Sequence, residues 1–117
     1  MNIIKSYPET LNKATLYAMT SGKQSEKLSS YVDEELNVRG YVLYETPDHE
    51  TGEVKRVLSI LTADNRVLST ISGSFIEEFT RICAIWSDEA LPPLQVYQLT
   101  SKKGRSYITC GIKLEAV

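Results

Sequence analysis

The order of hydrophobic patterns between residues 38 and 114 constrains the fold most strongly, because three strand-like segments precede one amphipathic helix and two more strand-like segments follow it. Short runs rich in β-branched and aromatic residues, bounded by turn residues, predict strands. The predicted strands cover residues 38–45, 54–62, 67–71, 94–100 and 106–114. This pattern predicts a mainly β domain with a helix between its third and fourth strands.

Turn-forming residues separate the predicted strands. The loop over residues 46–53 contains a proline and a glycine, and the tight turn over 63–66 contains Asp64 and Asn65, which tolerate a left-handed backbone. A basic segment with one glycine, residues 101–105, joins the last two strands as a hairpin.

The segment that follows the third strand is the clearest helix. Ser74 and Glu77 have the spacing of a capping box, and Pro92 and Pro93 stop the helix. Its apolar face holds Phe75, Phe79, Ile82, Cys83 and Trp86. We expect this face to plug a hydrophobic core, because aromatic residues at helical spacing are usually buried. Together the elements predict the five-stranded Greek-key barrel called the OB-fold, whose exposed face binds oligonucleotides.

The first thirty residues have a different pattern. Ser6 is placed to cap a helix over residues 8–20, although residues 15–20 also fit a strand. The predicted organisation is therefore one domain, in which a helical segment and loop over residues 1–30 pack on an OB-fold barrel over residues 31–117.

Composition predicts an ordinary globular domain. The chain has 117 residues and 42% hydrophobic residues, and no apolar run approaches the roughly 20 residues that a membrane span needs. Its first residues are too short an apolar stretch for a signal peptide, so we expect a cytoplasmic protein with no membrane partner. Cys83 and Cys110 lack metal-binding spacing, which predicts buried, reduced thiols.

The charges are unevenly distributed along the chain. A net charge of −2 disfavours binding to nucleic acid, because lysine and arginine contacts to phosphates dominate that affinity. Residues 94–117, however, carry four basic residues and one acid, whereas residues 72–93 carry four acids and one arginine. The sequence is compatible with a basic stripe on an acidic body and equally with a mixed solvated surface.

Side-chain alternation along the strands gives the candidate binding residues. In the last strand, one face holds Arg105, Tyr107, Thr109, Gly111 and Lys113, and this face is expected to meet solvent. Arg39 and Tyr41 are expected to share a polar face of the first strand. Aromatic residues that stack on bases, interleaved with cations that pair with phosphates, are what binding to single strands requires. Alternatively, the tyrosines simply suit half-buried strands. The predicted stacking residues are Tyr41, Tyr97 and Tyr107, and the predicted phosphate contacts are Arg39, Lys55, Arg56, Lys102, Lys103, Arg105 and Lys113.

No pattern in the sequence indicates an enzyme. The single histidine, His49, lies in a polar loop, where a lone histidine is usually solvated rather than catalytic. Nucleophile, phosphate-loop and metal-ligand motifs are absent from the sequence, so we expect neither catalysis nor a cofactor nor a metal.

Three segments carry a resemblance to a known family. Residues 57–64 read VLSILTAD, residues 67–72 read VLSTIS, and residues 100–109 read TSKKGRSYIT. In this order, with a helix between the second and third, they resemble the single-stranded DNA-binding proteins of bacteriophages that prime replication with a protein. The likeness covers residues 54–114, and Lys102, Lys103 and Arg105 occupy the family's hairpin.

The resemblance implies an OB-fold that protects single-stranded DNA, without sequence preference, during phage or mobile-element replication. Replication proteins would be further partners. The alternative function is an acidic protein-interaction module or an inhibitor of a host nucleic-acid-binding protein. The sequence leaves the choice between DNA and RNA open, because recognition of the 2′-hydroxyl depends on a few hydrogen bonds. It also leaves the oligomeric state open.

Overall fold

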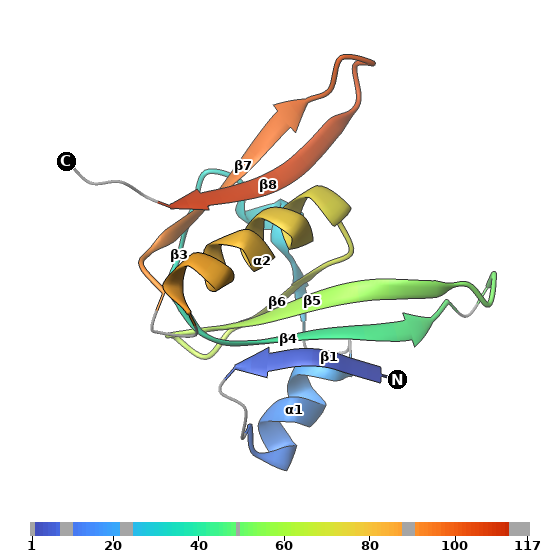
Figure 1. The fold of residues 1–117 in the computed structure, drawn as a ribbon, viewed down its shortest axis with the longest axis vertical. Coiled ribbons are helices and arrows are strands. Elements are labelled where there is room, and N and C mark those ends of the chain that lie inside the picture. The colour runs from blue at the N-terminus through green and yellow to red at the C-terminus, as the bar shows by residue number, and fades with distance from the viewer. Residues whose placement is uncertain (1, 8–10, 22–24, 49, 88–90, 113–117) are drawn as a thin grey trace.

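Strands dominate the computed structural model, which describes residues 2–7, 11–21, 25–48, 50–87 and 91–112 (Figure 1). Strands hold 47% of the described residues, and two α-helices make the class mixed α and β. The strands are β1 (Asn2–Tyr7), β2 (Glu26–Lys27), β3 (Glu35–Leu36), β4 (Val38–Pro47), β5 (Val54–Thr62), β6 (Val67–Thr70), β7 (Leu94–Thr100) and β8 (Ser106–Ile112). The helices are α1 (Lys13–Thr20), the 3-10 turn η1 (Leu28–Tyr31) and α2 (Gly73–Trp86).

The strands form two sheets. The order in the five-stranded sheet is β1-β4-β5-β6-β2, and the order in the three-stranded sheet is β3-β7-β8. Because β3 runs almost directly into β4, one continuous stretch of backbone belongs to both sheets. All five predicted strands and the helix between the third and fourth of them are confirmed, whereas the sequence did not predict β1, β2 or β3. The last strand is confirmed over residues 106–112, and residues 113 and 114 lie outside the described part of the chain.

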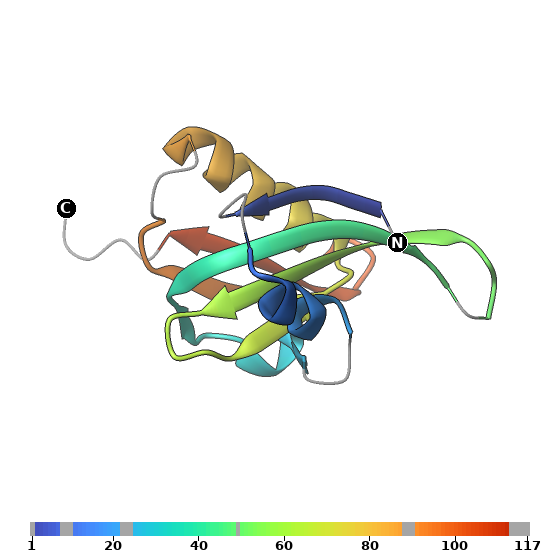
Figure 2. The same ribbon diagram turned by 90° about the horizontal axis from the view of Figure 1, so that it is seen from below.

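Both faces of the five-stranded sheet are covered. In Figure 2, α1 lies on one side of the sheet and α2 on the other. On the α1 side, the buried residues are Met19, Val42, Tyr44, Val57, Leu61 and Val67. On the α2 side, the core includes Tyr41, Leu43, Leu58, Ile60, Leu68, Phe75 and Phe79. Successive residues of β4 and β5 therefore enter two different cores, as in sheets buried on both faces.

Because both faces of the sheet are covered, Tyr41 does not lie on an exposed binding face. Its side chain is only 5% exposed, so the prediction that it faces solvent beside Arg39 is wrong. The ring packs edge-on against Phe79, with 5.1 Å between ring centroids, and stacks on Tyr7 of β1 at 6.1 Å. A register shift between Val38 and Gly40 also breaks the alternation of β4, and it leaves Arg39 exposed.

The start of α2 differs from the predicted capping box. Ser72, not Ser74, is the N-cap, and its hydroxyl accepts a 3.4 Å hydrogen bond from the backbone N–H of Phe75. The Ser74 hydroxyl instead donates to the carbonyl of Ile108 at 2.9 Å, which fastens the helix to β8. The apolar face of the helix is confirmed, since Phe75, Phe79, Ile82 and Cys83 are buried and Trp86 packs against the core.

The N-terminal helix is confirmed over part of its predicted length. It begins at Lys13, because the Asn12 side chain accepts a 2.8 Å hydrogen bond from the backbone N–H of Thr15 and caps it. Ser6 lies in β1, so its predicted capping role is wrong. Residues 8–10 lie outside the described part of the chain. The tight turn over 63–66 is confirmed, with Asn65 at φ +66°.

The two cysteines are buried and free, as predicted. Burial, with a smaller contribution from Glu78, raises the pKa of Cys110 to about 12.

Because the thiolate is the nucleophile, we expect iodoacetamide at about pH 8 to label Cys110 only after denaturation. The unfolded thiol ionises near pH 8.5 while the folded one stays protonated, so the free energy of unfolding should fall as pH rises above about 8.5. Labelling of Cys110 in the native protein, followed by mass spectrometry, would contradict its burial.

Candidate nucleic-acid interface

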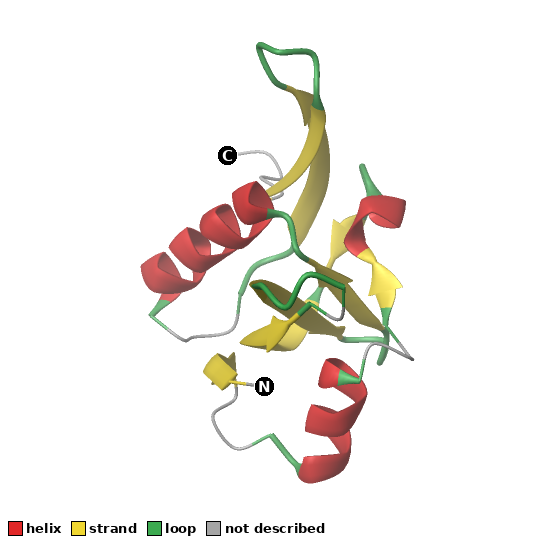
Figure 3. Ribbon diagram, turned by 90° about the vertical axis from the view of Figure 1, so that its right-hand side faces the viewer, coloured by secondary structure: helices red, strands yellow, loops and turns green. Residues whose placement is uncertain are grey.

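The hairpin of β7 and β8 extends away from the rest of the molecule and carries a basic tip, defined here as Lys102, Lys103 and Arg105 (Figures 1 and 3). The turn closes through a 2.8 Å hydrogen bond from the Ser101 N–H to the Arg105 carbonyl, and Gly104 takes the left-handed φ of +81° that the turn requires. All three cations are exposed, and none makes an ion pair with another described residue. Residues 91–112 contain no acid, so the hairpin itself contributes only positive charge to the tip.

One face of this hairpin presents apolar surface beside the basic tip. The cross-strand pairs place Gln95, Tyr97, Leu99, Tyr107, Thr109 and Gly111 on this hairpin face. Leu99 and Tyr107 lie directly opposite each other and are 45% and 37% exposed. The Tyr97 ring covers Gly111, where a Cβ atom would lie 3.0 Å from the ring. The hairpin face therefore offers one partly buried aromatic ring, Tyr97, and one exposed ring, Tyr107.

Lys55 and Arg56 on β5 form a second group of predicted cations. Lys55 Nζ lies 3.9 Å from an Asp48 carboxylate oxygen, and Arg56 Nη2 lies 3.6 Å from a Glu45 carboxylate oxygen. The Lys55 and Arg56 side chains are 41% and 57% exposed. Exposed pairs of this kind contribute about 0–1 kcal/mol, so a phosphate can compete with either carboxylate.

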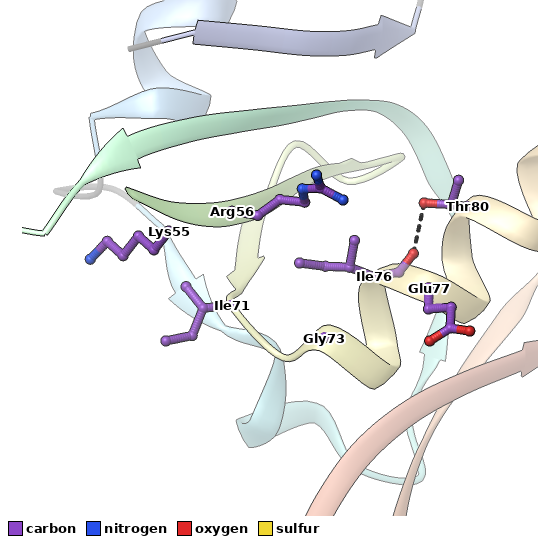
Figure 4. Close-up of a pocket in the computed structure, with 7 residues that line it drawn as sticks. All are labelled: Lys55, Arg56, Ile71, Gly73, Ile76, Glu77 and Thr80. Carbon is purple, nitrogen blue, oxygen red and sulfur yellow. Dashed lines mark hydrogen bonds between the residues drawn. The ribbon is translucent and has the colours of Figure 1, made fainter. Parts of the chain in front are cut away.

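These two cations line a hollow of about 660 Å³ between β5 and the start of α2 (Figure 4). In Figure 4, Lys55 and Arg56 point in opposite directions, and Ile71 and Ile76 supply apolar lining between β5 and the helix. Glu77 lies at the helix side of the hollow, so the local charge is mixed. The arrangement can hold an anion on Lys55 or on Arg56 and an apolar ring on the exposed Ile71.

The predicted residues thus fall into distinct places. The basic tip and Tyr107 lie together on the hairpin of the three-stranded sheet, Lys55 and Arg56 lie on β5 of the five-stranded sheet, and Tyr41 is in the core. Tyr97 is partly buried, and Lys113 lies outside the described residues.

The sequence analysis missed Ile71, which is 65% exposed at the end of β6. The sequence pattern does not show whether an isoleucine at the end of a predicted strand is buried or exposed. Arg66 is a further exposed cation, but it stacks on Tyr31 at 5.1 Å and bonds Asp64 at 2.9 Å. These contacts give Arg66 a structural role in tying η1 to the turn over 63–66.

Other classes of site receive no support from the described residues. Among them, no group of three or more His, Cys, Asp or Glu side chains could hold a metal ion, and His49 lies outside them. No helix in the described ranges is long and apolar enough to cross a membrane. The chain matches no protein-family model, no curated protein and no solved structure.

Proposed function

We propose that this protein binds single-stranded DNA without sequence preference and protects it during replication, as a binding protein and not as an enzyme. The observation that carries the proposal is the β7–β8 hairpin. Its tip has three exposed cations that form no ion pair with other described residues, and next to the tip lie the exposed side chains of Leu99 and Tyr107. Cations that follow the backbone and an aromatic ring that stacks on any base give binding that tolerates all sequences.

The strand arrangement supports an OB-fold as the framework of this function. The antiparallel strands β4, β5 and β6, then α2, then the β7–β8 hairpin follow the element order of that barrel. In OB-folds, the second and third strands and the loops after the first and fourth strands bind the ligand. Here those parts are β5, β6, the connection over 48–53 and the basic tip, which include Lys55, Arg56 and all three tip cations.

The overall charge of −2 does not oppose this proposal, because the charges are segregated. Phosphates respond to the local potential within about 10 Å at 0.1 M salt. Since residues 91–112 carry no acid, a nucleic-acid strand at the hairpin tip meets three cations and no acid of the hairpin itself.

Titration with fluorescently labelled poly-dT at low and moderate salt tests the function. Binding should be detectable at low salt, vary by less than about tenfold with base composition, and weaken as salt rises, because each neutralised phosphate releases counterions. Absence of binding at low salt would contradict the proposal and favour a protein-interaction module. A preference for duplex DNA would contradict the use of an exposed stacking residue.

Replacement of Tyr107 by alanine separates stacking from charge. We expect the binding free energy to weaken by about 1–3 kcal/mol, because a stacking platform is lost, while the dependence of affinity on salt stays constant. Tyr17→Ala is the matched control, since Tyr17 is 64% exposed on α1. If Tyr107→Ala lowered the melting temperature and left binding by the folded protein unchanged, Tyr107 would be a packing residue and not a stacking one.

A further inference from the structure

Ile71 lies at the centre of a groove that extends beyond the hollow in Figure 4. It also lines neighbouring hollows of about 480, 330 and 370 Å³. These spaces share lining residues, so they are contiguous around the Ile71 side chain. We name as the Ile71 groove the surface formed by Lys27, Ser29, Ser69, Thr70, Ile71 and Tyr107.

The N-terminal part of the chain forms one wall of this groove. β2 pairs in parallel with β6, with Lys27 opposite Ser69, and the Ser69 hydroxyl donates to the Ser25 hydroxyl at 3.2 Å. Leu28, the next residue, is fully buried and anchors the segment in the core. Lys27 and Ser29 on either side of this anchor are therefore held at the groove, although they lie about forty residues before Ile71 in the sequence.

Two lysines near the groove could contact the phosphates of a single-stranded nucleic acid. Lys27 makes no ion pair with the other described residues, and Lys55 lines the adjoining hollow. Three acids lie near these lysines: Glu77 lines the hollow beside Lys55, and the other two already have partners. Glu26 accepts a hydrogen bond from the Tyr31 hydroxyl, and Asp48 pairs with Lys55.

The groove also connects the two groups of predicted cations. Its β8 side includes Tyr107, which is two residues from the basic tip, and its β5 side reaches Lys55. An exposed isoleucine between these groups offers a flat base an apolar contact that does not depend on base identity. The volumes of the hollows around it fall within the range of about 300–1,000 Å³ that is usual for ligand sites.

We propose that the N-terminal segment over residues 25–31 completes the binding site, so that a single-stranded nucleic acid leaving the hairpin places a base against Ile71 and a phosphate on Lys27. This inference rests on the proposed function, and it gives a binding role to a part of the chain outside the OB-fold order. The occupied site is then longer than the hairpin alone.

Two pairs of variants test the groove with oligo-dT. Ile71→Ala should weaken binding about five- to tenfold, because most of one apolar side-chain contact is lost, and should leave the salt dependence unchanged. Its control is Ile85→Ala, since Ile85 is 61% exposed on α2, away from the groove residues. Lys27→Ala should reduce the log–log salt slope by about 0.7, and Lys13→Ala, at the far end of α1 from the groove, should not.

The outcomes separate the groove from the proposed function. If the unmodified protein fails to bind, the proposed function is wrong and the groove has no ligand. If it binds and Tyr107→Ala weakens it, but Ile71→Ala and Lys27→Ala behave as their controls do, the groove proposal is overturned and the proposed function stands. Because Ile71 and Lys27 are exposed, we expect each of these variants to have a melting temperature close to that of the unmodified protein.

Discussion

Replacing Phe79 with alanine is expected to lower the free energy of unfolding by about 3–5 kcal/mol, the usual cost of deleting a buried phenylalanine. Phe79 is 1% exposed, packs at 5.1 Å against Tyr41 and stacks at 6.3 Å on Phe75. Its loss therefore opens a cavity where α2 meets the five-stranded sheet. Denaturant unfolding followed by circular dichroism would measure the change, which is a large fraction of the roughly 5–15 kcal/mol of a typical domain.

Ile85→Ala is the control for this experiment, because it truncates an exposed apolar residue of the same helix and should change stability little. Nucleic-acid binding by Phe79→Ala should fall only in proportion to the unfolded fraction. If Phe79→Ala stayed fully folded but lost binding, α2 would be the binding surface and the hairpin assignment would be wrong.

Local patterns predicted the elements whose formation depends mainly on local sequence. The predicted bounds of β5 and β7 agree with the structure, and the N-cap of α2 lies two residues before the predicted one. Each of these segments has a regular pattern bounded by turn residues, and the basic tip lies in the predicted hairpin turn. The candidate site on the hairpin could be read from sequence for the same reason, because one short segment supplies its cations and its tyrosine.

The N-terminal third could not be predicted in the same way. β2 and β3 have two residues each, too few to show a period, and β1 is defined by its pairing with β4 about forty residues later. Such pairing depends on tertiary contacts that intrinsic strand propensity does not reveal.

The face assignments failed where the sequence analysis assumed that one side of the sheet meets solvent. Tyr41 fits an alternating pattern, but α1 and α2 cover both faces of β4, and the irregularity at Arg39 shifts the pattern. The opposite error concerns Ile71. Its apolar side chain continues the strand pattern, which is typical of a buried residue, but it is exposed because β6 ends just before it. In both cases, the position of other elements decides the exposure.

Replacing Lys102, Lys103 and Arg105 together with alanine is expected to weaken binding to poly-dT by about 10²–10³-fold at about 50 mM salt. If each cation contributes one phosphate contact, the log–log salt slope should fall by about 2.1, since a single strand contributes about 0.7 for each contact. The affinities of the variant and the unmodified protein should therefore converge as salt approaches about 1 M. Fluorescence titrations over a range of salt concentrations give both quantities.

The matched control removes three other exposed cations, Lys5, Lys13 and Arg81, which lie on β1, α1 and α2. Both triple variants change the net charge from −2 to −5, so a difference between them reports the position of the charges and not their sum. Equal losses in the two variants would mean that the long-range field alone drives binding and that the hairpin is no specific site. The tip cations make no ion pairs with described residues, so their removal should leave the melting temperature nearly unchanged. A loss of affinity confined to the hairpin variant, at constant stability, is therefore the result that identifies the basic tip as the phosphate-binding surface.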